Sequence, residues 1–135
     1  MALPAGSDDA VYGAAFREVV LPLLRAYAPE IILVSAGFDA HARDPLASMQ
    51  LSTATYGAMT AALLEVAESL GHGRVGFFLE GGYDLQALEA SMAQLGLGLK
   101  GATRGLPEGT LRSVDRAAIE ATKRALAVRW PLPAA

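Results

Sequence analysis

Cysteine is absent from the 135-residue sequence, and histidine occurs only twice, at His41 and His72. The absence of cysteine excludes disulfides, thiolate nucleophiles and cysteine metal sites. A metal ion would therefore have to be held by histidine, carboxylate or other oxygen ligands. With so few histidines, the sequence offers little general acid–base chemistry of its own near neutral pH.

Charge and long apolar runs are also scarce. Charged residues make up 19% of the chain, and the formal net charge of -3 provides no basic field for nucleic acid or anionic lipid. No uninterrupted apolar stretch approaches the roughly 20 residues of a membrane-spanning helix, and the first residues lack the pattern of a signal peptide. We therefore expect a cytoplasmic protein with no nucleic-acid partner and no membrane partner.

Hydrophobic residues, in contrast, are abundant. They make up 53% of the chain, so either the core is large or part of the apolar surface meets a partner. A chain of this length has the usual size of one domain. We expect a single domain over residues 1–135.

Apolar periodicity and chain-breaking residues predict an α/β fold. Apolar residues at helical spacing predict helices near 9–28, 53–70, 84–98 and 113–129. Pro22 should bend the first helix or start a new segment, and Pro29 should end it. Residues 101–110 are glycine-rich and predict a loop, and the prolines at 131 and 133 should end the last helix.

Two short apolar runs, near 31–35 and 75–79, are typical of strands buried on both faces of a parallel sheet. Helices alternate with them, which predicts right-handed crossovers and a functional site at the carboxyl ends of the strands. The stretch Ser35 to Leu51 contains the chain-turning signals Gly37 and Asp44-Pro45 and predicts an ordered, functional loop.

Two motifs follow these strands. The first is SAGFDAHARDPL at residues 35–46, and the second is LEGGYDL at residues 79–85. Together they resemble the histone deacetylase and acetylpolyamine amidohydrolase family. The resemblance is clearest over residues 3–99 and extends toward the Trp130-Pro131 tail. It implies the C-terminal portion of an arginase/deacetylase-like fold and a zinc-dependent hydrolysis of acetylated lysine or polyamine amides.

The resemblance also implies roles for individual residues. Asp39 matches the later of two aspartate zinc ligands in the family, and Tyr83 matches the catalytic tyrosine that donates a hydrogen bond to the amide oxygen. Gly37, Gly81 and Gly82 match the backbone of the substrate loops, where glycine permits a close turn.

The residues alone also allow structural roles. Asp39 could instead cap a turn or pair with Arg43, and Tyr83 could be a partly buried residue at the start of a helix. His41 lies two positions after Asp39 and could share a metal with it, but we expect a solvent-facing loop residue.

Two further ionisable side chains have simpler explanations. His72 lies between two glycines and is expected to cap a helix or to be exposed. Glu80 lies at a strand end and is expected to anchor a neighbouring loop rather than to act as a general acid.

The resemblance implies groups that match no position of this chain, namely a pair of general-base histidines and two more zinc ligands. We therefore expect no catalysis in isolation and no stoichiometric zinc. The expected partner is the missing N-terminal half or a second copy, with an acylated amine or acetyl-lysine substrate only in a complete site. The alternative is a non-catalytic oligomerising or binding module derived from the same fold.

Overall fold

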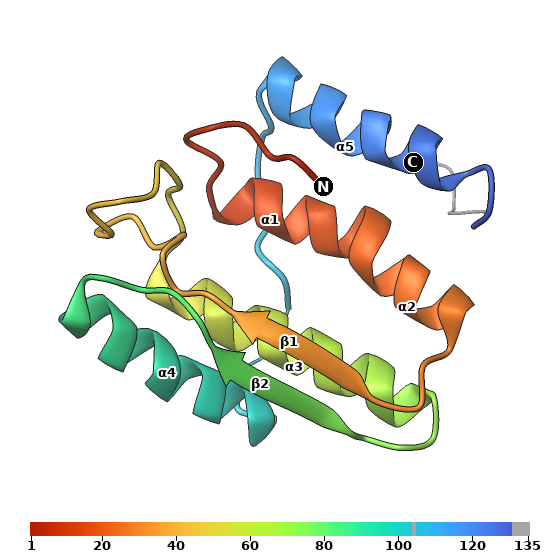
Figure 1. Cartoon of the computed structure of the whole chain (residues 1–135), viewed down its shortest axis with the longest axis horizontal. Coiled ribbons are helices and arrows are strands. Elements are labelled where there is room, and N and C mark those ends of the chain that lie inside the picture. The colour runs from red at the N-terminus through yellow and green to blue at the C-terminus, as the bar shows by residue number, and fades with distance from the viewer. Residues whose placement is uncertain (104, 131–135) are drawn as a thin grey trace.

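The computed structural model describes residues 1–103 and 105–130. Its elements are, in chain order, α1 (Asp9–Ala15), η1 (Phe16–Val20), α2 (Leu21–Tyr27), β1 (Ile32–Ala36), α3 (Thr53–Ser69), β2 (Val75–Leu79), α4 (Leu85–Leu99) and α5 (Ser113–Leu126) (Figure 1). The predicted α/β fold is confirmed. Helix α5 ends before the expected residue 129, and the prolines at 131 and 133 lie outside the described residues.

The two strands run parallel, so both of them end at the same edge of the sheet. Ala36 lies opposite Leu79 at this shared carboxyl end. The ladder continues beyond it, because the Glu80 N–H donates to the Ala36 carbonyl at 3.2 Å and the Phe38 N–H donates to the Gly81 carbonyl at 2.8 Å. The segments that follow the strands therefore begin side by side.

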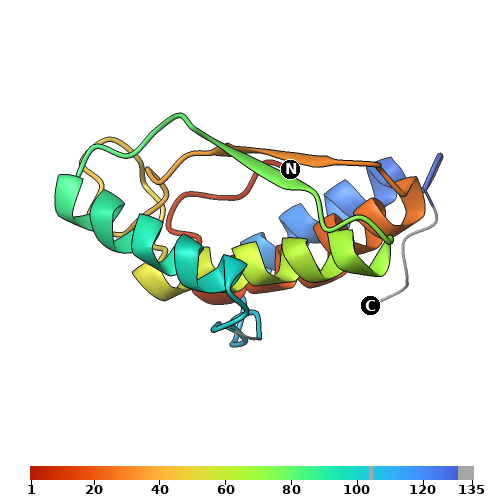
Figure 2. The same cartoon turned by 90° about the horizontal axis from the view of Figure 1, so that it is seen from below.

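The helices α3 and α4 cover one face of the sheet, as Figure 2 shows. On the other face, Leu33 and Phe78 are 62% and 59% exposed. The expectation that both strands are buried on both faces is therefore wrong for the described residues. Apolar composition predicts burial, but it does not say which segment covers each face.

The first helical region is built from three segments around Pro22, which lies in the first turn of α2. Just before it, the Leu21 N–H reaches back to the Phe16 carbonyl, which is the i→i−5 bond of a π-helical turn. Proline cannot donate a backbone hydrogen bond, and its ring clashes with the carbonyl of the preceding turn, so the regular α-helical pattern is interrupted here. The region ends at Ala28, whose φ of 50° is left-handed, directly before Pro29.

Helices α3 and α4 cross at two glycines, Gly57 and Gly98. A Cβ atom on Gly98 would lie 2.5 Å from the Gly57 carbonyl oxygen and 2.9 Å from the Thr60 Cβ. Such contacts allow the helix backbones to approach closely and leave no room for a side chain. The close approach sets the distance between α3 and the C-terminal end of α4.

Replacing Gly98 by alanine should therefore destabilise the fold by about 1–3 kcal/mol, because the new methyl group overpacks the α3–α4 contact. Gly96→Ala is the matched control in the same helix, since nothing lies within 4 Å of its Cβ position. This control should be neutral or stabilising by up to about 1 kcal/mol. Urea unfolding followed by circular dichroism measures both, and equal midpoints for the two variants would contradict the close contact.

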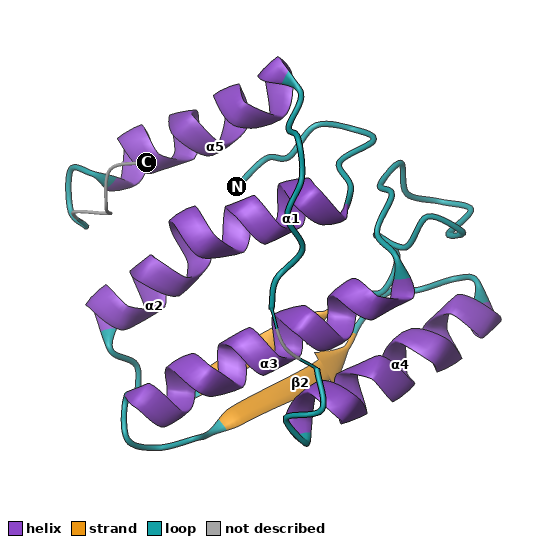
Figure 3. Ribbon diagram, turned by 180° about the vertical axis from the view of Figure 1, so that it is seen from behind, coloured by secondary structure: helices purple, strands orange, loops and turns teal. Residues whose placement is uncertain are grey.

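The connection from α4 to α5 crosses α3 and α1 (Figure 3). Arg17 holds it there, because its Nη1 donates to the Leu106 and Pro107 carbonyls at 3.2 and 2.8 Å. Gly13 of α1 lies directly beneath the Pro107 carbonyl, where a Cβ atom would clash.

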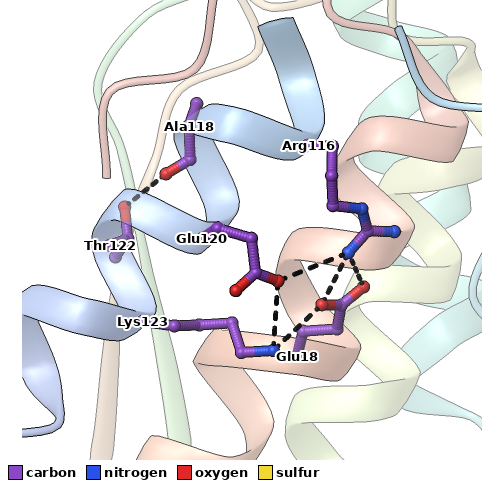
Figure 4. Close-up of polar contacts among 6 residues, drawn as sticks. All are labelled: Glu18, Arg116, Ala118, Glu120, Thr122 and Lys123. Carbon is purple, nitrogen blue, oxygen red and sulfur yellow. Dashed lines mark hydrogen bonds and ion pairs between the residues drawn. The ribbon is translucent and has the colours of Figure 1, made fainter. Parts of the chain in front are cut away.

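Helix α5 packs on α1 and η1 through Ile119, which is fully buried, and through a charged cluster beside it (Figure 4). Arg116 Nη1 donates to both carboxylate oxygens of Glu18, at 2.6 and 2.8 Å. Lys123 Nζ lies 3.4 Å from Glu18 and 3.3 Å from Glu120. Burial of the Glu18 carboxyl opposes its ionisation, but Arg116 and Lys123 outweigh this effect and lower the pKa of Glu18.

A lowered pKa in the folded state means that ionised Glu18 stabilises the fold above its ordinary pKa of 4.5, and that this contribution is lost as the pH falls through the folded-state pKa. Glu18→Gln should therefore destabilise the chain at pH 7, by about 1 kcal/mol, and progressively less on acidification below pH 4.5. Thermal or urea unfolding across this pH range measures the difference. The exposed Glu89→Gln variant should show no such trend, and a Glu18→Gln effect independent of pH would contradict the ion-pair explanation.

Candidate functional site

The candidate site is formed by two loops at the carboxyl edge of the sheet: the Asp39 loop (residues 37–51) and the Tyr83 loop (residues 80–84). Glycines bring them together. A Cβ atom on Gly37 would lie 2.8 Å from Asp39 Oδ1, and one on Gly81 would lie 3.1–3.3 Å from the Asp39 carboxyl group. Gly82 has a φ of +129°, which disfavours other residues. The Asp39 carboxylate therefore rests in a cradle that side chains would fill.

The Asp39 carboxylate is partly exposed and has free lone pairs. Within residues 1–103 and 105–130, no hydrogen bond or ion pair involves it. The alternative that Asp39 pairs with Arg43 is wrong, since the Arg43 guanidinium lies 3.0 Å from Asp84 instead. A carboxylate held at the end of a strand and left without a partner fits a metal ligand. Among the described residues, no three candidate metal ligands lie close together.

Tyr83 follows the second strand at the same edge. Its side chain is not buried at the helix start, because the residue is 56% exposed. Its backbone N–H donates to Asp44 Oδ2 at 2.8 Å. The structure thus brings Tyr83 and Asp39 to one edge of the sheet, while their roles as catalytic residue and metal ligand stay predictions.

Asp44 joins the two loops through a buried carboxylate. Besides accepting from Tyr83, it accepts at Oδ1 from the N–H groups of Leu46 and Ala47, at 2.9 and 3.2 Å. Burial opposes its charge, but these donors prevail and lower the pKa of Asp44. The sequence marks Asp44-Pro45 as a turn. It carries no signal for the contact with Tyr83, which is 39 positions away.

Arg43 makes a second connection between the loops. Its Nη2 lies 3.0 Å from Asp84 Oδ2 and donates to Gln86 Oε1 at 2.9 Å. Asp84 in turn caps α4 by accepting from the Ala87 N–H at 2.8 Å. This hydrogen bond, together with Arg43, lowers the pKa of Asp84.

Two packed aromatic residues, Phe38 and Tyr56, support the Asp39 loop on the side of α3. The Tyr56 hydroxyl donates to the Phe38 carbonyl at 3.1 Å, and both side chains are buried. Burial, with smaller effects of Tyr12 and Asp39, raises the pKa of Tyr56, so the phenol stays neutral and can donate. An apolar pocket of about 180 Å³ lies beside these two side chains. Gly37 and Phe38 of the Asp39 loop line it, whereas Asp39 and Tyr83 do not.

His41 is buried, and the expectation that it faces solvent is wrong. Its Nδ1 accepts from the Arg43 N–H at 3.1 Å, so Nε2 carries the proton and donates to Thr53 Oγ1 at 2.9 Å. The reason is that the loop returns to the start of α3, where His41 bridges to Leu51. With both nitrogens engaged, His41 is a structural residue and not a partner of Asp39 in a metal site.

The other two ionisable candidates form local contacts. His72 Nδ1 accepts from the Arg74 N–H at 2.9 Å, just beyond the end of α3. Glu80 accepts from the Ser35 hydroxyl at 2.9 Å and so links the two strand ends. Neither contact indicates catalysis.

Comparison with known proteins decides the family. The family described as histone deacetylase domain matches residues 1–99. The chain belongs to the histone deacetylase family. The family predicted from the two motifs is thereby confirmed.

Individual relatives agree with this assignment. Over 91 residues, 67% of this chain and 20% of the relative, the chain is 52% identical to "Histone deacetylase 10, chloroplastic" of Oryza sativa subsp. japonica. Over 81 residues, 60% of this chain and 21% of the relative, it is 47% identical to a histone deacetylase-like amidohydrolase of Pseudomonas aeruginosa. The solved HDA15 HD domain superposes with a TM-score of 0.83 at 31% identity, over 95% of this chain and 33% of that one.

The chain spans about a fifth of the length of these curated relatives. It thus corresponds to part of a deacetylase domain, and the α/β fold is the deacetylase fold. No helix within the described residues is long and apolar enough to span a membrane. The name of the rice relative places that protein in the chloroplast, and a cytoplasmic location of this chain stays a prediction.

Proposed function

We propose that this chain forms one wall of a zinc-dependent deacetylase site, in which Asp39 is a metal ligand and Tyr83 is the hydrogen-bond donor to the substrate. The unpartnered Asp39 carboxylate in its glycine cradle, at the edge where Tyr83 also emerges, is the observation that carries this proposal. The family membership supports it.

Each residue has a distinct chemical task in this proposal. Zinc, when bound, supplies a Lewis acid for hydrolysis of an acyl amide. The strand end and the glycine cradle hold the Asp39 carboxylate in a fixed direction for one ligand bond. The Tyr83 hydroxyl donates to the amide oxygen and stabilises the negative charge that develops there as water adds to the carbonyl carbon. The proposed substrates are acetylated lysine or polyamine amines.

In this proposal, the site also needs groups from outside this chain. The described residues contain no cluster of three possible metal ligands, and both nitrogens of buried His41 are engaged. We propose that two further zinc ligands and the general base come from the rest of a deacetylase domain, on the same polypeptide or on another. The chain alone should then neither hold zinc stoichiometrically nor hydrolyse amides.

A hybrid enzyme tests these roles. In it, residues 1–99 of this chain replace the matching part of the Pseudomonas aeruginosa amidohydrolase. The hybrid should bind zinc and deacetylate an acetyl-lysine reporter. Asp39→Ala should lose both properties. Tyr83→Phe should keep the zinc but lower kcat by about 100-fold or more, because it removes a donor that acts on the developing charge.

Tyr27→Phe is the matched control, since Tyr27 is an exposed tyrosine outside the two loops; it should change neither zinc content nor kcat. A folded hybrid that retains zinc after Asp39→Ala, or full activity after Tyr83→Phe, would contradict the corresponding role. Stoichiometric zinc and hydrolysis by the isolated chain would contradict the need for further groups.

We propose that the open face of the sheet is a partner surface. Three apolar residues that alternate onto this face are 50–62% exposed: Ile31, Leu33 and Phe78. In addition, a two-stranded parallel sheet leaves alternate backbone groups unpaired along both outer edges. We propose that the rest of the deacetylase domain covers this surface. When the rest of the domain is absent, the exposed apolar residues favour the second candidate function, which is an oligomerising module.

The isolated chain should therefore self-associate, and light scattering coupled to size-exclusion chromatography should give a mass above that of the 14.0 kDa monomer. The double variant Leu33→Lys, Phe78→Lys should shift the mass toward the monomer, because it places charge on the open face. Val128→Lys is the control, since Val128 is 87% exposed but lies beyond α5. A monodisperse wild-type monomer would refute self-association.

A further inference from the structure

We propose that Asp44 is the positioning residue for Tyr83: its carboxylate holds the Tyr83 backbone at a set place relative to the Asp39 loop. This inference rests on the catalytic role proposed for Tyr83. The direct observation is the 2.8 Å hydrogen bond from the Tyr83 N–H to Asp44 Oδ2, made by a residue that is only 8% exposed.

The carboxylate is oriented by its own loop before it reaches Tyr83. Oδ1 accepts from the N–H groups of Leu46 and Ala47, which leaves Oδ2 directed at the Tyr83 loop. Both oxygens act as acceptors, a pattern that an ionised aspartate provides and an asparagine cannot. In an Asp44→Asn variant, the two donors in the Asp39 loop would retain the carbonyl oxygen. The amide nitrogen would then face the Tyr83 N–H.

Backbone contacts are needed here because the Tyr83 side chain is 56% exposed, and packing alone therefore constrains it little. On one side, Gly82 turns the chain with its φ of +129°. On the other side, Arg43 binds the carboxylate of Asp84 at 3.0 Å. The consecutive residues Arg43 and Asp44 thus hold the consecutive residues Tyr83 and Asp84. The direction of the phenol follows from the backbone position set by these contacts.

Amide hydrogen exchange of the full chain, measured by NMR, tests the contact independently of activity. The Tyr83 amide should be protected in the wild type. Asp44→Asn should lower its protection by about tenfold or more, which is the expected effect of losing a hydrogen bond to a charged acceptor. The amides of Leu46 and Ala47 should keep most of their protection. Asp44→Ala should expose all three amides.

Asp8→Ala is the matched control. It removes an aspartate that accepts from the Val11 N–H at the start of α1, and it has no contact with Tyr83. This variant should leave Tyr83 protection unchanged after correction for global stability. A wild-type Tyr83 amide that exchanges as fast as an unstructured peptide overturns the proposal, whether or not either Asp44 variant folds. Equal loss of protection in the Asp8 and Asp44 variants overturns it too.

The hybrid enzyme separates positioning from general stability. Asp44→Asn should lower kcat by about tenfold or more with little change in KM, because small displacements of a catalytic group are costly. In the Tyr83→Phe background the same substitution should have almost no further effect. Multiplicative effects would overturn the proposal. An inactive hybrid would instead argue against the proposed function, and the exchange data would still decide the role of Asp44.

Discussion

Parallel pairing of β1 with β2 is the constraint on which the candidate site depends. Two parallel neighbours end at one edge, so the segments that follow them cannot separate until the ladder stops. Here the ladder extends past both strands, through the hydrogen bond from the Phe38 N–H to the Gly81 carbonyl. An antiparallel pair would send the Asp39 and Tyr83 loops to opposite ends of the sheet, and no side-chain contact could then join them.

The joined loops are stabilised mainly by polar contacts between neighbouring backbone segments. Asp44 and Arg43 reach across to the Tyr83 loop, and Glu80 reaches back to Ser35. Beneath them, Tyr56 supports Phe38 from the helix layer. The core thus fixes the Asp39 loop relative to the helix layer, while charged and hydroxyl groups fix the two loops relative to each other. Tyr83 takes part only through its backbone N–H, and within the described residues the side chains of Asp39 and Tyr83 form none of these contacts.

Much of the fold could be predicted from local pattern. The strands were recognisable because runs rich in β-branched and aromatic residues are bounded by proline or glycine, and Pro22 marked the new helical segment. The position of Asp39 and Tyr83 at one sheet edge follows from the alternation of helices and strands, and the two motifs suffice to predict the family.

Other features of the fold and the site depend on contacts between residues distant in the chain, and the local sequence pattern does not predict them. The burial of His41 results from the return of its loop to α3, and the Asp44–Tyr83 bond joins positions 39 residues apart. The glycine contact between α3 and α4 depends on the crossing of two helices, which neither helix specifies alone. The open sheet face was likewise not evident, because apolar strands look the same whether or not a second layer covers them.

The stacked arrangement of His41 on Tyr56, with ring centroids 6.5 Å apart and planes 11° apart, has a consequence for metal capture. This packing and the hydrogen bonds of His41 and Tyr56 stabilise the turn that carries Asp39. They form on folding and need no metal ion. The conformational entropy of that turn is then lost during folding and not during binding. In the proposed metal site, a cation would therefore meet a carboxylate already held in position, and its affinity would not be reduced by the need to order a flexible loop.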